Sequence, residues 1–238
     1  MRAVIIGASG GIGRALVDHL AARANIEAIH AFARQDLDWS HSKIRPGQLD
    51  LLDEASIADA AASVAADGPP DLVFVSTGIL SDGAELQPEK SFRKQDRAAF
   101  ERVFAINTFG PALIAKHFIP IMPRQKRAVF AALSARVGSI SDNRLGGWHA
   151  YRASKAALNM LIKNYAIEQS RRNEQFIAVS LHPGTVDTAL SKPFQGNVPD
   201  AQLFTPEKSA GALLDVIDQL TPADSGNSFD WAGKPIPA

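Results

Sequence analysis

The chain has 238 residues, of which 46% are hydrophobic and 21% charged, and its formal net charge is zero. This length and composition fit one α/β domain with a single sizeable core, as in an ordinary globular enzyme. A nucleic-acid-binding protein would usually carry an excess of basic residues, so nucleic acid is disfavoured as a partner. The sequence contains no cysteine, which excludes disulfide bridges and thiolate chemistry.

The N-terminus leads from a short apolar run directly into a glycine, without the features of a signal peptide. The apolar runs stay well below the roughly 18 residues that a membrane-spanning helix needs. We therefore expect no membrane partner and a cytoplasmic location. The six histidines lack the spacing of a metal site, so no metal is expected.

Short apolar runs alternate with longer helical stretches along the whole chain. The expected strands are Ala3–Ile6, Ala28–Ala33, Gln48–Leu51, Asp71–Ser76, Ala128–Leu133, Phe176–His182 and Ser225–Asp230. The expected helices are Gly13–Ala24, Ser56–Ala66, Ala98–Met122, Ser154–Arg171 and Pro206–Leu220. Such alternation predicts a single α/β domain over residues 1–238, with a doubly wound parallel sheet of about seven strands and helices on both faces. The polar segment Ser191–Phe204 is expected to be a loop that shapes a substrate site.

The first expected strand ends in the glycine-rich sequence GASGGIG over residues 7–13. The spacing fits a dinucleotide site in a Rossmann fold, because glycines there allow a tight turn and a close approach of the backbone to a pyrophosphate. The following helix offers free N–H groups and a partial positive charge to the phosphates. The residues expected to contact the dinucleotide in this turn are Gly7, Ser9, Gly11, Ile12 and Gly13.

The end of the second expected strand indicates which dinucleotide binds. An NAD-binding chain usually has an acidic residue there for the ribose hydroxyls, whereas this chain has Ala33-Arg34. An arginine can stack on adenine and pair with a 2′-phosphate, so we expect NADP as the cofactor. NAD is the less favoured alternative, because Arg34 can also be a solvated surface residue and Asp36 lies close by.

Tyr151 and Lys155 are four residues apart, so that both face the same side of a helix that begins here. A free tyrosine has a pKa of about 10. We expect the neighbouring ammonium, together with the positive charge of an oxidised nicotinamide, to lower the pKa of Tyr151. A tyrosine so placed can exchange a proton with a carbonyl or alcohol oxygen.

This tyrosine–lysine pair, downstream of a glycine-rich first turn, resembles the short-chain dehydrogenase/reductase family. Further matches follow in the family's order along nearly the whole chain. Asp50-Leu51 resembles the pair that flanks the adenine, Gly78 matches the end of an Asn-Asn-Ala-Gly motif, and Pro183-Gly184-Thr185-Val186-Asp187-Thr188 resembles the segment after the sixth strand. The resemblance implies that Asp50, Leu51, Gly78, Tyr151, Lys155, Pro183, Gly184, Val186 and Thr188 all contact the cofactor.

The resemblance also implies a catalytic set of Asn107, Ser134, Tyr151 and Lys155. Pro111 lacks an N–H group for the Asn107 carbonyl, so we expect a bend and an open acceptor at Asn107, with a simple proline kink as the alternative. Ser134 lies at the end of an expected strand, where the family places its serine. Ser139 fits the family's usual spacing to the tyrosine better but is expected in a loop.

The implied reaction is hydride transfer between NADP(H) and a small carbonyl or alcohol substrate, with Ser134 binding the substrate oxygen. Val75-Ser76-Thr77 departs from the family's asparagines. The segment Arg136–Trp148 and the chain end resemble the C-factor-like branch, named for a cell–cell signalling protein. A non-catalytic dinucleotide-binding sensor or signalling protein is therefore the alternative. Many relatives pair through the helices that carry Asn107 and Tyr151, which implies a homodimer or homotetramer.

Overall fold

The computed structural model describes residues 1–238, apart from the side chain of Asn197. Its centre is an eight-stranded sheet with the strand order β10-β9-β6-β5-β4-β1-β2-β3. Neighbouring strands are parallel except for β10, which pairs antiparallel with β9. The strands are β1 (Arg2–Ile6), β2 (Ala28–Ala33), β3 (Ile44–Gln48), β4 (Leu72–Val75), β5 (Ala128–Leu133), β6 (Phe176–His182), β9 (Ser228–Asp230) and β10 (Pro235–Ile236).

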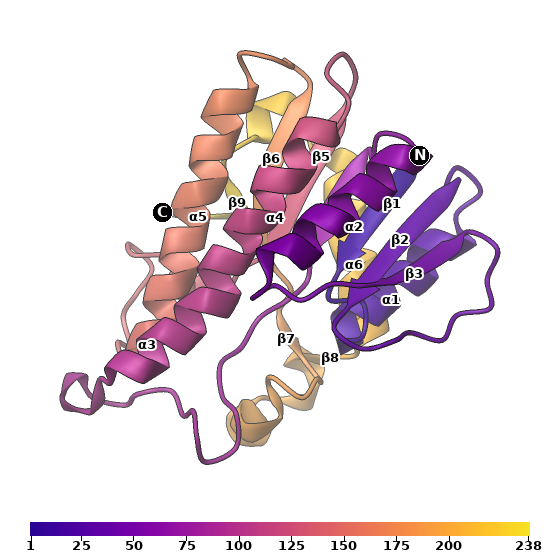
Figure 1. Ribbon diagram of the computed structural model, residues 1–238. Coiled ribbons are helices and arrows are strands. Elements are labelled where there is room, and N and C mark those ends of the chain that lie inside the picture. Colours follow the sequence, from indigo (N-terminus) through magenta and orange to yellow (C-terminus); the bar gives the residue numbers. More distant parts are fainter.

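Helices cover both faces of this sheet (Figure 1). They are α1 (Gly11–Ala22), α2 (Glu54–Asp67), α3 (Arg97–Phe104), α4 (Gly110–Phe118), α5 (His149–Gln169) and α6 (Pro206–Gln219). Helices α1 and α6 form one core with the sheet, and α2, α4 and α5 form the other. Strand β1 shows why both cores exist, because Ala3 and Ile5 face the first and Val4 and Ile6 face the second. The predicted doubly wound α/β fold is confirmed.

Most element boundaries lie within three residues of the prediction, and the starts of β3 and α5 shift further. The third strand was expected at Gln48–Leu51, but β3 spans Ile44–Gln48 and contains Pro46. Strand β3 pairs only with β2 and lies at the sheet edge. A proline is tolerated there, because no second neighbouring strand needs the N–H group that it lacks. Helix α5 begins at His149, five residues before the expected start at Ser154, and so includes Tyr151 in its first turn.

The expected helix Ala98–Met122 is interrupted in its middle. Between α3 and α4 lies a π-helical turn over Ala105–Phe109, in which the Gly110 N–H donates to the Ala105 carbonyl. The helix changes its hydrogen-bonding pattern just before Pro111, as expected for a residue that cannot donate to Asn107. The chain ends this stretch with a 3₁₀ turn over Ile119–Ile121.

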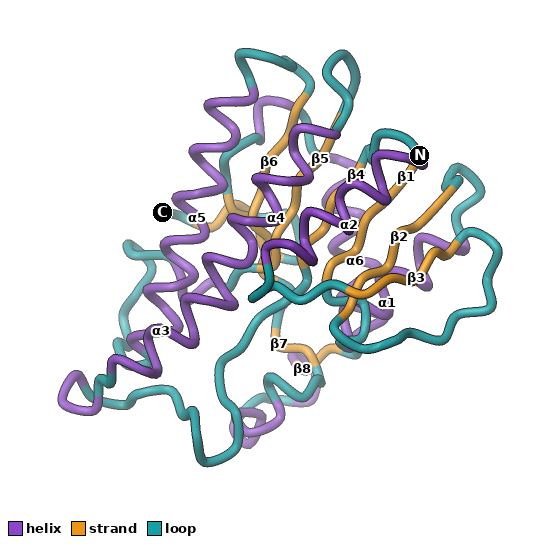
Figure 2. Tube along the Cα trace, in the orientation of Figure 1, coloured by secondary structure: helices purple, strands orange, loops and turns teal.

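The carboxyl ends of the parallel strands carry long loops and a separate short ribbon (Figure 2). Strands β7 (Thr185–Val186) and β8 (Leu203–Phe204) form this two-stranded ribbon. The expected loop Ser191–Phe204 therefore has structure of its own, with 3₁₀ turns at Lys192–Asn197 and Asp200–Gln202 and then β8. Among the described residues, none of the helices is both long and apolar enough to cross a membrane.

Candidate active site

The glycine turn after β1 can be built only with glycine at two of its positions. Gly7 has a φ of +89°, and a Cβ atom there would lie 2.7 Å from the Thr77 methyl. A Cβ atom at Gly13 would lie 2.1 Å from the Gly7 carbonyl oxygen. Ser76 holds the turn from β4, because its hydroxyl donates to the Ile6 carbonyl at 2.7 Å. The turn is therefore pressed closely onto the ends of β1 and β4.

The residues expected around the adenosine lie at the neighbouring strand ends. Arg34 follows the buried end of β2 and is exposed. Asp50 turns the chain after β3, since its carboxylate accepts the Leu52 N–H at 2.9 Å. Leu51 is buried and packs on Gly110, where a Cβ atom would lie 3.1 Å from the Leu51 Cβ. These segments therefore lie with the glycine turn at the carboxyl ends of the parallel strands.

The segment after β6 returns across the glycine turn. A Cβ atom at Gly11 would lie 3.0 Å from the Thr188 methyl and 3.3 Å from a side-chain carbon of Pro206. The Pro183 carbonyl accepts a hydrogen bond from Ser209 at 2.8 Å, which fixes the start of the segment. Thr188 thus lies where a dinucleotide on the turn would pass.

Gly184 and Val186 lie within this returning segment. Gly184 has a φ of +80° and packs against the rings of Phe204 and Trp231. Val186 is buried in β7, and its carbonyl accepts the Thr188 hydroxyl at 3.4 Å. Of the remaining turn residues, Ser9 is exposed and Ile12 packs partly into the core under α1.

Tyr151 and Lys155 lie side by side on α5, and both are almost completely buried. The Lys155 ammonium is 5.9 Å from the centre of the Tyr151 ring. It donates to the Leu133 carbonyl at the end of β5, at 2.8 Å. This bond fixes the lysine between the helix and the carboxyl end of the sheet, on the side where the glycine turn lies.

Burial dominates the pKa values of Tyr151 and Lys155 in the protein by itself. Burial raises the pKa of Tyr151 to about 12 and lowers the pKa of Lys155 to about 7. Desolvation disfavours the charged form of each group, and the protein by itself does not offset this cost. Burial therefore opposes acidification, and the phenol of the protein by itself is protonated near neutral pH. The expected lowering of the Tyr151 pKa by the ammonium together with an oxidised nicotinamide stays a prediction.

Asn107 connects three parts of the site. Its side chain accepts the Ile79 N–H at 2.8 Å and donates to the Ile79 carbonyl at 2.9 Å. It also donates to the Ser154 hydroxyl at 3.1 Å. A Cβ atom at Gly78 would lie 3.5 Å from the Asn107 Oδ1 and 3.6 Å from the Lys155 Nζ. Gly78, Asn107 and Lys155 therefore meet at one point, although the chain separates them widely.

The two candidate serines are placed differently. Ser134 donates its hydroxyl proton to the Asn159 Oδ1 at 2.8 Å, and Asn159 lies two helical turns beyond Tyr151 on α5. Ser139 is buried and follows Gly138, where a Cβ atom would lie 2.8 Å from the Lys155 Cβ. Both serines therefore stay candidates: the Ser134 proton is used inside the fold, whereas Ser139 lies at the level of Lys155 and accepts the Asp142 N–H at 3.1 Å.

The family model for short chain dehydrogenases matches residues 1–198. The chain belongs to the short-chain dehydrogenase family. Its members are oxidoreductases, and this chain is one of them by sequence and by fold. The sequence-based expectation of this family is confirmed.

Individual relatives agree with this assignment. C-signal of Myxococcus xanthus is 35% identical over 71% of this chain and 93% of its own length, which confirms the expected C-factor-like relative. The 1-hydroxy-2-glutathionyl-2-methyl-3-butene dehydrogenase of Rhodococcus sp. (strain AD45) is 32% identical over 94% of this chain and 93% of its own length. The NADPH-bound carbonyl reductase from chicken fatty liver superimposes with a TM-score of 0.84 at 27% identity, covering 100% of this chain and 98% of its own.

The residues of this short-chain dehydrogenase fit a dinucleotide. Helix α1 begins after Gly10, which has no side chain to cap the first N–H groups, so these groups are free for phosphate. The Thr77 hydroxyl is buried beside Gly7 and has no hydrogen-bond partner among the described residues. Leu133 is the one acceptor described for the Lys155 ammonium, which carries three protons. The start of α1, Thr77 and Lys155 thus offer free hydrogen-bond donors to a dinucleotide.

Sequence reasoning missed three residues of the short-chain dehydrogenase site. Trp148 precedes α5 in a left-handed backbone conformation, with its ring next to Tyr151. Glu89 is buried, and its carboxylate accepts the Ala150 N–H at 3.3 Å. Phe194 contacts the Trp148 ring from the segment Ser191–Phe204. Only Trp148, an aromatic residue three positions before Tyr151, carried a signal in the sequence, because the contacts of Glu89 and Phe194 arise from folding.

Proposed function

We propose that this short-chain dehydrogenase is an NADP-dependent oxidoreductase that interconverts a small carbonyl compound and its alcohol. The proposal depends on one observation: Tyr151 and Lys155 lie on the first turns of α5, and the ammonium faces Gly78 and Asn107 at the carboxyl ends of the strands. The known NADPH complex of the chicken carbonyl reductase supports NADP as the cofactor. The exposed Arg34 supports it as well, since a guanidinium can pair with a 2′-phosphate.

Each residue has a defined task in this proposal. The glycine turn and Thr188 hold the phosphates, Asp50 and Leu51 flank the adenine, and the segment Pro183–Thr188 positions the nicotinamide end. Bound NADP(H) supplies or accepts the hydride, and its oxidised form brings a positive charge to the site. That charge favours ionisation of the Tyr151 phenol, which burial alone opposes. Tyr151 then exchanges one proton with the substrate oxygen as the C–H bond forms or breaks.

Lys155 and Asn107 act on Tyr151 and on the cofactor. With a pKa of about 7, the Lys155 amine can bind or release a proton under physiological conditions. Asn107 fixes the chain at Ile79, next to Gly78, and so sets the wall that Lys155 faces. Ser139 supplies the hydroxyl that binds the substrate oxygen in place of Ser134.

The test measures oxidation of NADPH and of NADH over a panel of aldehydes and ketones. We expect turnover with NADPH, a loss of at least about 10³-fold in Tyr151→Phe, and nearly unchanged NADPH binding in that variant. Ser139→Ala should lower turnover by about 10²-fold, whereas Ser134→Ala should leave turnover nearly normal. A strong preference for NADH would refute the cofactor assignment. Equal losses in the two serine variants would refute the choice of Ser139.

One observation favours a second candidate function. The C-signal relative, by its name, is a signal, and the altered Ser76-Thr77 lies directly under the glycine turn. A dinucleotide-binding signalling protein without turnover is therefore the alternative. It predicts NADPH binding by calorimetry together with an absence of substrate reduction over the whole panel, in wild type as in Tyr151→Phe.

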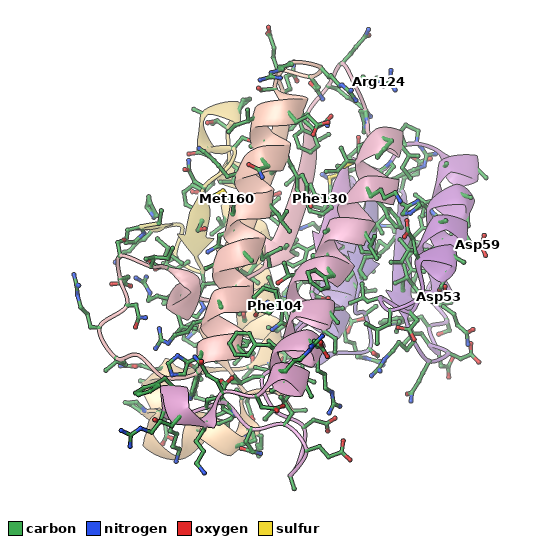
Figure 3. The ribbon with its side chains drawn as sticks, turned by 60° about the vertical axis from the view of Figure 1, so that its left-hand side comes forward. Asp53, Asp59, Phe104, Arg124, Phe130 and Met160 are labelled. Carbon is green, nitrogen blue, oxygen red and sulfur yellow. The ribbon has the colours of Figure 1, made fainter. Side chains whose placement is uncertain are left out.

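The outer helical face supports self-association. Met160 and Ile167, seven residues apart on α5, are 62% and 50% exposed, and Phe109 on the neighbouring π-helical turn is 56% exposed. Met160 projects from α5 on this face in Figure 3. Apolar side chains grouped on one face mark an interaction surface. We propose a homodimer or homotetramer formed through it, while a cytoplasmic location stays a prediction.

A further inference from the structure

Trp148 has a backbone conformation that its residue type disfavours. Its φ and ψ of 50° and 46° lie in the left-handed region, and the other residues described with positive φ are all glycines. A bulky side chain in this region is strained, and such strain persists where the surrounding structure enforces it. Trp148 is also the N-cap of α5, a position at which a short polar side chain would be preferred. Local preferences therefore do not explain this tryptophan.

The surrounding structure holds Trp148 in place from both sides. Its N–H donates to the Glu89 carbonyl at 2.5 Å, and its own carbonyl accepts the Arg152 N–H at 2.8 Å. Both oxygens of the buried Glu89 carboxylate lie 3.3 Å from the Ala150 nitrogen. The Glu89 carboxylate thus accepts a free N–H group at the start of α5, which the Trp148 side chain cannot do. The indole is left free for another task, in a fixed orientation.

The indole joins Tyr151 to the segment Ser191–Phe204. Its ring lies edge-to-face on Tyr151, with centroids 6.3 Å apart and planes at 79°. It also contacts the Phe194 ring, with centroids 5.1 Å apart and planes at 58°. Trp148 and Phe194 are only partly buried, so their rings keep free surface. The three rings make a continuous aromatic wall that begins at the proton-donating phenol.

We infer that this aromatic wall, formed by Tyr151, Trp148 and Phe194, selects carbonyl substrates that carry an aryl group next to the carbonyl. This inference rests on the proposed function of the same site. A flat aryl ring gains edge-to-face or offset contacts with such a wall, whereas a saturated ring of the same size gains only dispersion. We place the aryl group on Trp148 and Phe194 and the carbonyl oxygen at the Tyr151 hydroxyl. Trp148 is a specificity-determining residue for this reaction.

The experiment compares benzaldehyde with cyclohexanecarboxaldehyde, which has the same number of carbons but a saturated ring. The ratio of kcat/KM for the two aldehydes, with NADPH, is measured in wild type, Trp148→Gly, Trp148→Phe and the control Phe92→Ala. Glycine tolerates the left-handed backbone, so Trp148→Gly removes the ring while keeping the fold, which circular dichroism checks. Phe92 is 68% exposed and lies outside the wall, so it controls for loss of an aromatic ring.

We expect Trp148→Gly to lower the ratio about tenfold, mainly through KM for benzaldehyde. Trp148→Phe should restore it to within about threefold of wild type, and Phe92→Ala should leave it unchanged. A folded Trp148→Gly variant with the wild-type ratio overturns the inference. If Trp148→Gly does not fold, Phe194→Leu takes its place with the same expected loss.

Benzaldehyde binding distinguishes this inference from the proposed function. Calorimetry on Tyr151→Phe loaded with NADPH measures that binding without turnover. If wild type reduces neither aldehyde but benzaldehyde binds and needs the Trp148 ring, the enzymatic proposal fails and the aromatic wall stands. If benzaldehyde binds equally with and without the Trp148 ring, or does not bind at all, the wall is refuted whatever the turnover.

Discussion

Replacing Lys155 by methionine should make the cofactor-free protein more stable while abolishing its activity. The lysine is 2% exposed, and burial lowers its pKa from the ordinary value of 10.5 to about 7. Below pH 7 the folded state must therefore bury an ammonium that the unfolded chain leaves in water. A pKa difference of this size corresponds to about 5 kcal/mol, since each pH unit is worth about 1.4 kcal/mol.

The sign of the pH dependence follows from the direction of this shift. Because the folded pKa lies below the unfolded one, the wild type releases its proton earlier in the folded state and gains stability as the pH rises from 7 towards 10.5. Between pH 7 and 9.5 we expect wild type to gain about 3 kcal/mol relative to Lys155→Met. Tyr151 does not interfere in this window, because burial raises its pKa to about 12 and its effect begins only near pH 10.

The assay is urea unfolding of both proteins at several pH values, followed by circular dichroism without nucleotide. Loss of the hydrogen bond from Lys155 to the Leu133 carbonyl costs Lys155→Met about 1 kcal/mol, which opposes its advantage below pH 7 but does not itself create a pH dependence. Equal m-values in the two proteins would show that the same surface unfolds. Parallel stability curves for wild type and Lys155→Met between pH 7 and 9.5 would refute the claim that Lys155 is buried with a pKa near neutrality.

Two further predictions concern a buried histidine on β2 and the exposed face of α5. Burial, with the charges of Arg45 and Arg2, lowers the pKa of His30 from 6.5 to about 4 and outweighs the opposite effect of the Asp67 carboxylate, 3.0 Å from its Nε2. Stability is therefore lost as the pH falls from 6.5 to 4, because the folded state resists protonation of this imidazole. We expect that loss to reach about 3 kcal/mol and to be missing from the urea unfolding of His30→Asn; an identical acid loss in this variant would contradict the assignment. Met160→Glu should reduce the molar mass by light scattering from dimer or tetramer to monomer, whereas Leu52→Glu, at a site 63% exposed against 62%, should not. A wild type that is already a monomer, or an unchanged mass in Met160→Glu, would rule out the proposed helical interface.

Patterns within short stretches of the sequence predicted most of the fold. Strands β5 and β6 lie where their apolar runs predicted them, because a strand buried on both faces reads as a continuous apolar run. The proline at position 111 indicated the change of helical pattern that the structure shows as a π-helical turn. The prediction failed at β3, because Pro46 breaks a central strand but is tolerated at an edge, and only the assembled sheet makes β3 an edge.

Features of the site that depend on spacing within one helix were predictable from the sequence. Features that depend on burial or on contacts with distant segments were not. The spacing of Tyr151 and Lys155 predicted that both share one helix face, because residues four apart are neighbours on the surface of an α-helix. The opposing effect of burial on the tyrosine pKa could not be predicted from spacing, because desolvation depends on how deeply the fold buries the phenol. The choice between Ser134 and Ser139 depends on the fold in the same way, because Asn159 reaches Ser134 only once α5 packs on β5.

The amino-acid sequence by itself determined the family, the dinucleotide turn and the helical pair, because each depends on backbone geometry or spacing within a few residues. The tertiary structure alone decided that the Ser134 hydroxyl donates to Asn159 and how strongly Lys155 and Tyr151 are desolvated. It also decided that Glu89 holds Trp148 against Tyr151 and Phe194. These properties depend on contacts between segments far apart in the chain. Burial and hydrogen-bond partners of this kind exist only after the sheet and its helices have packed together.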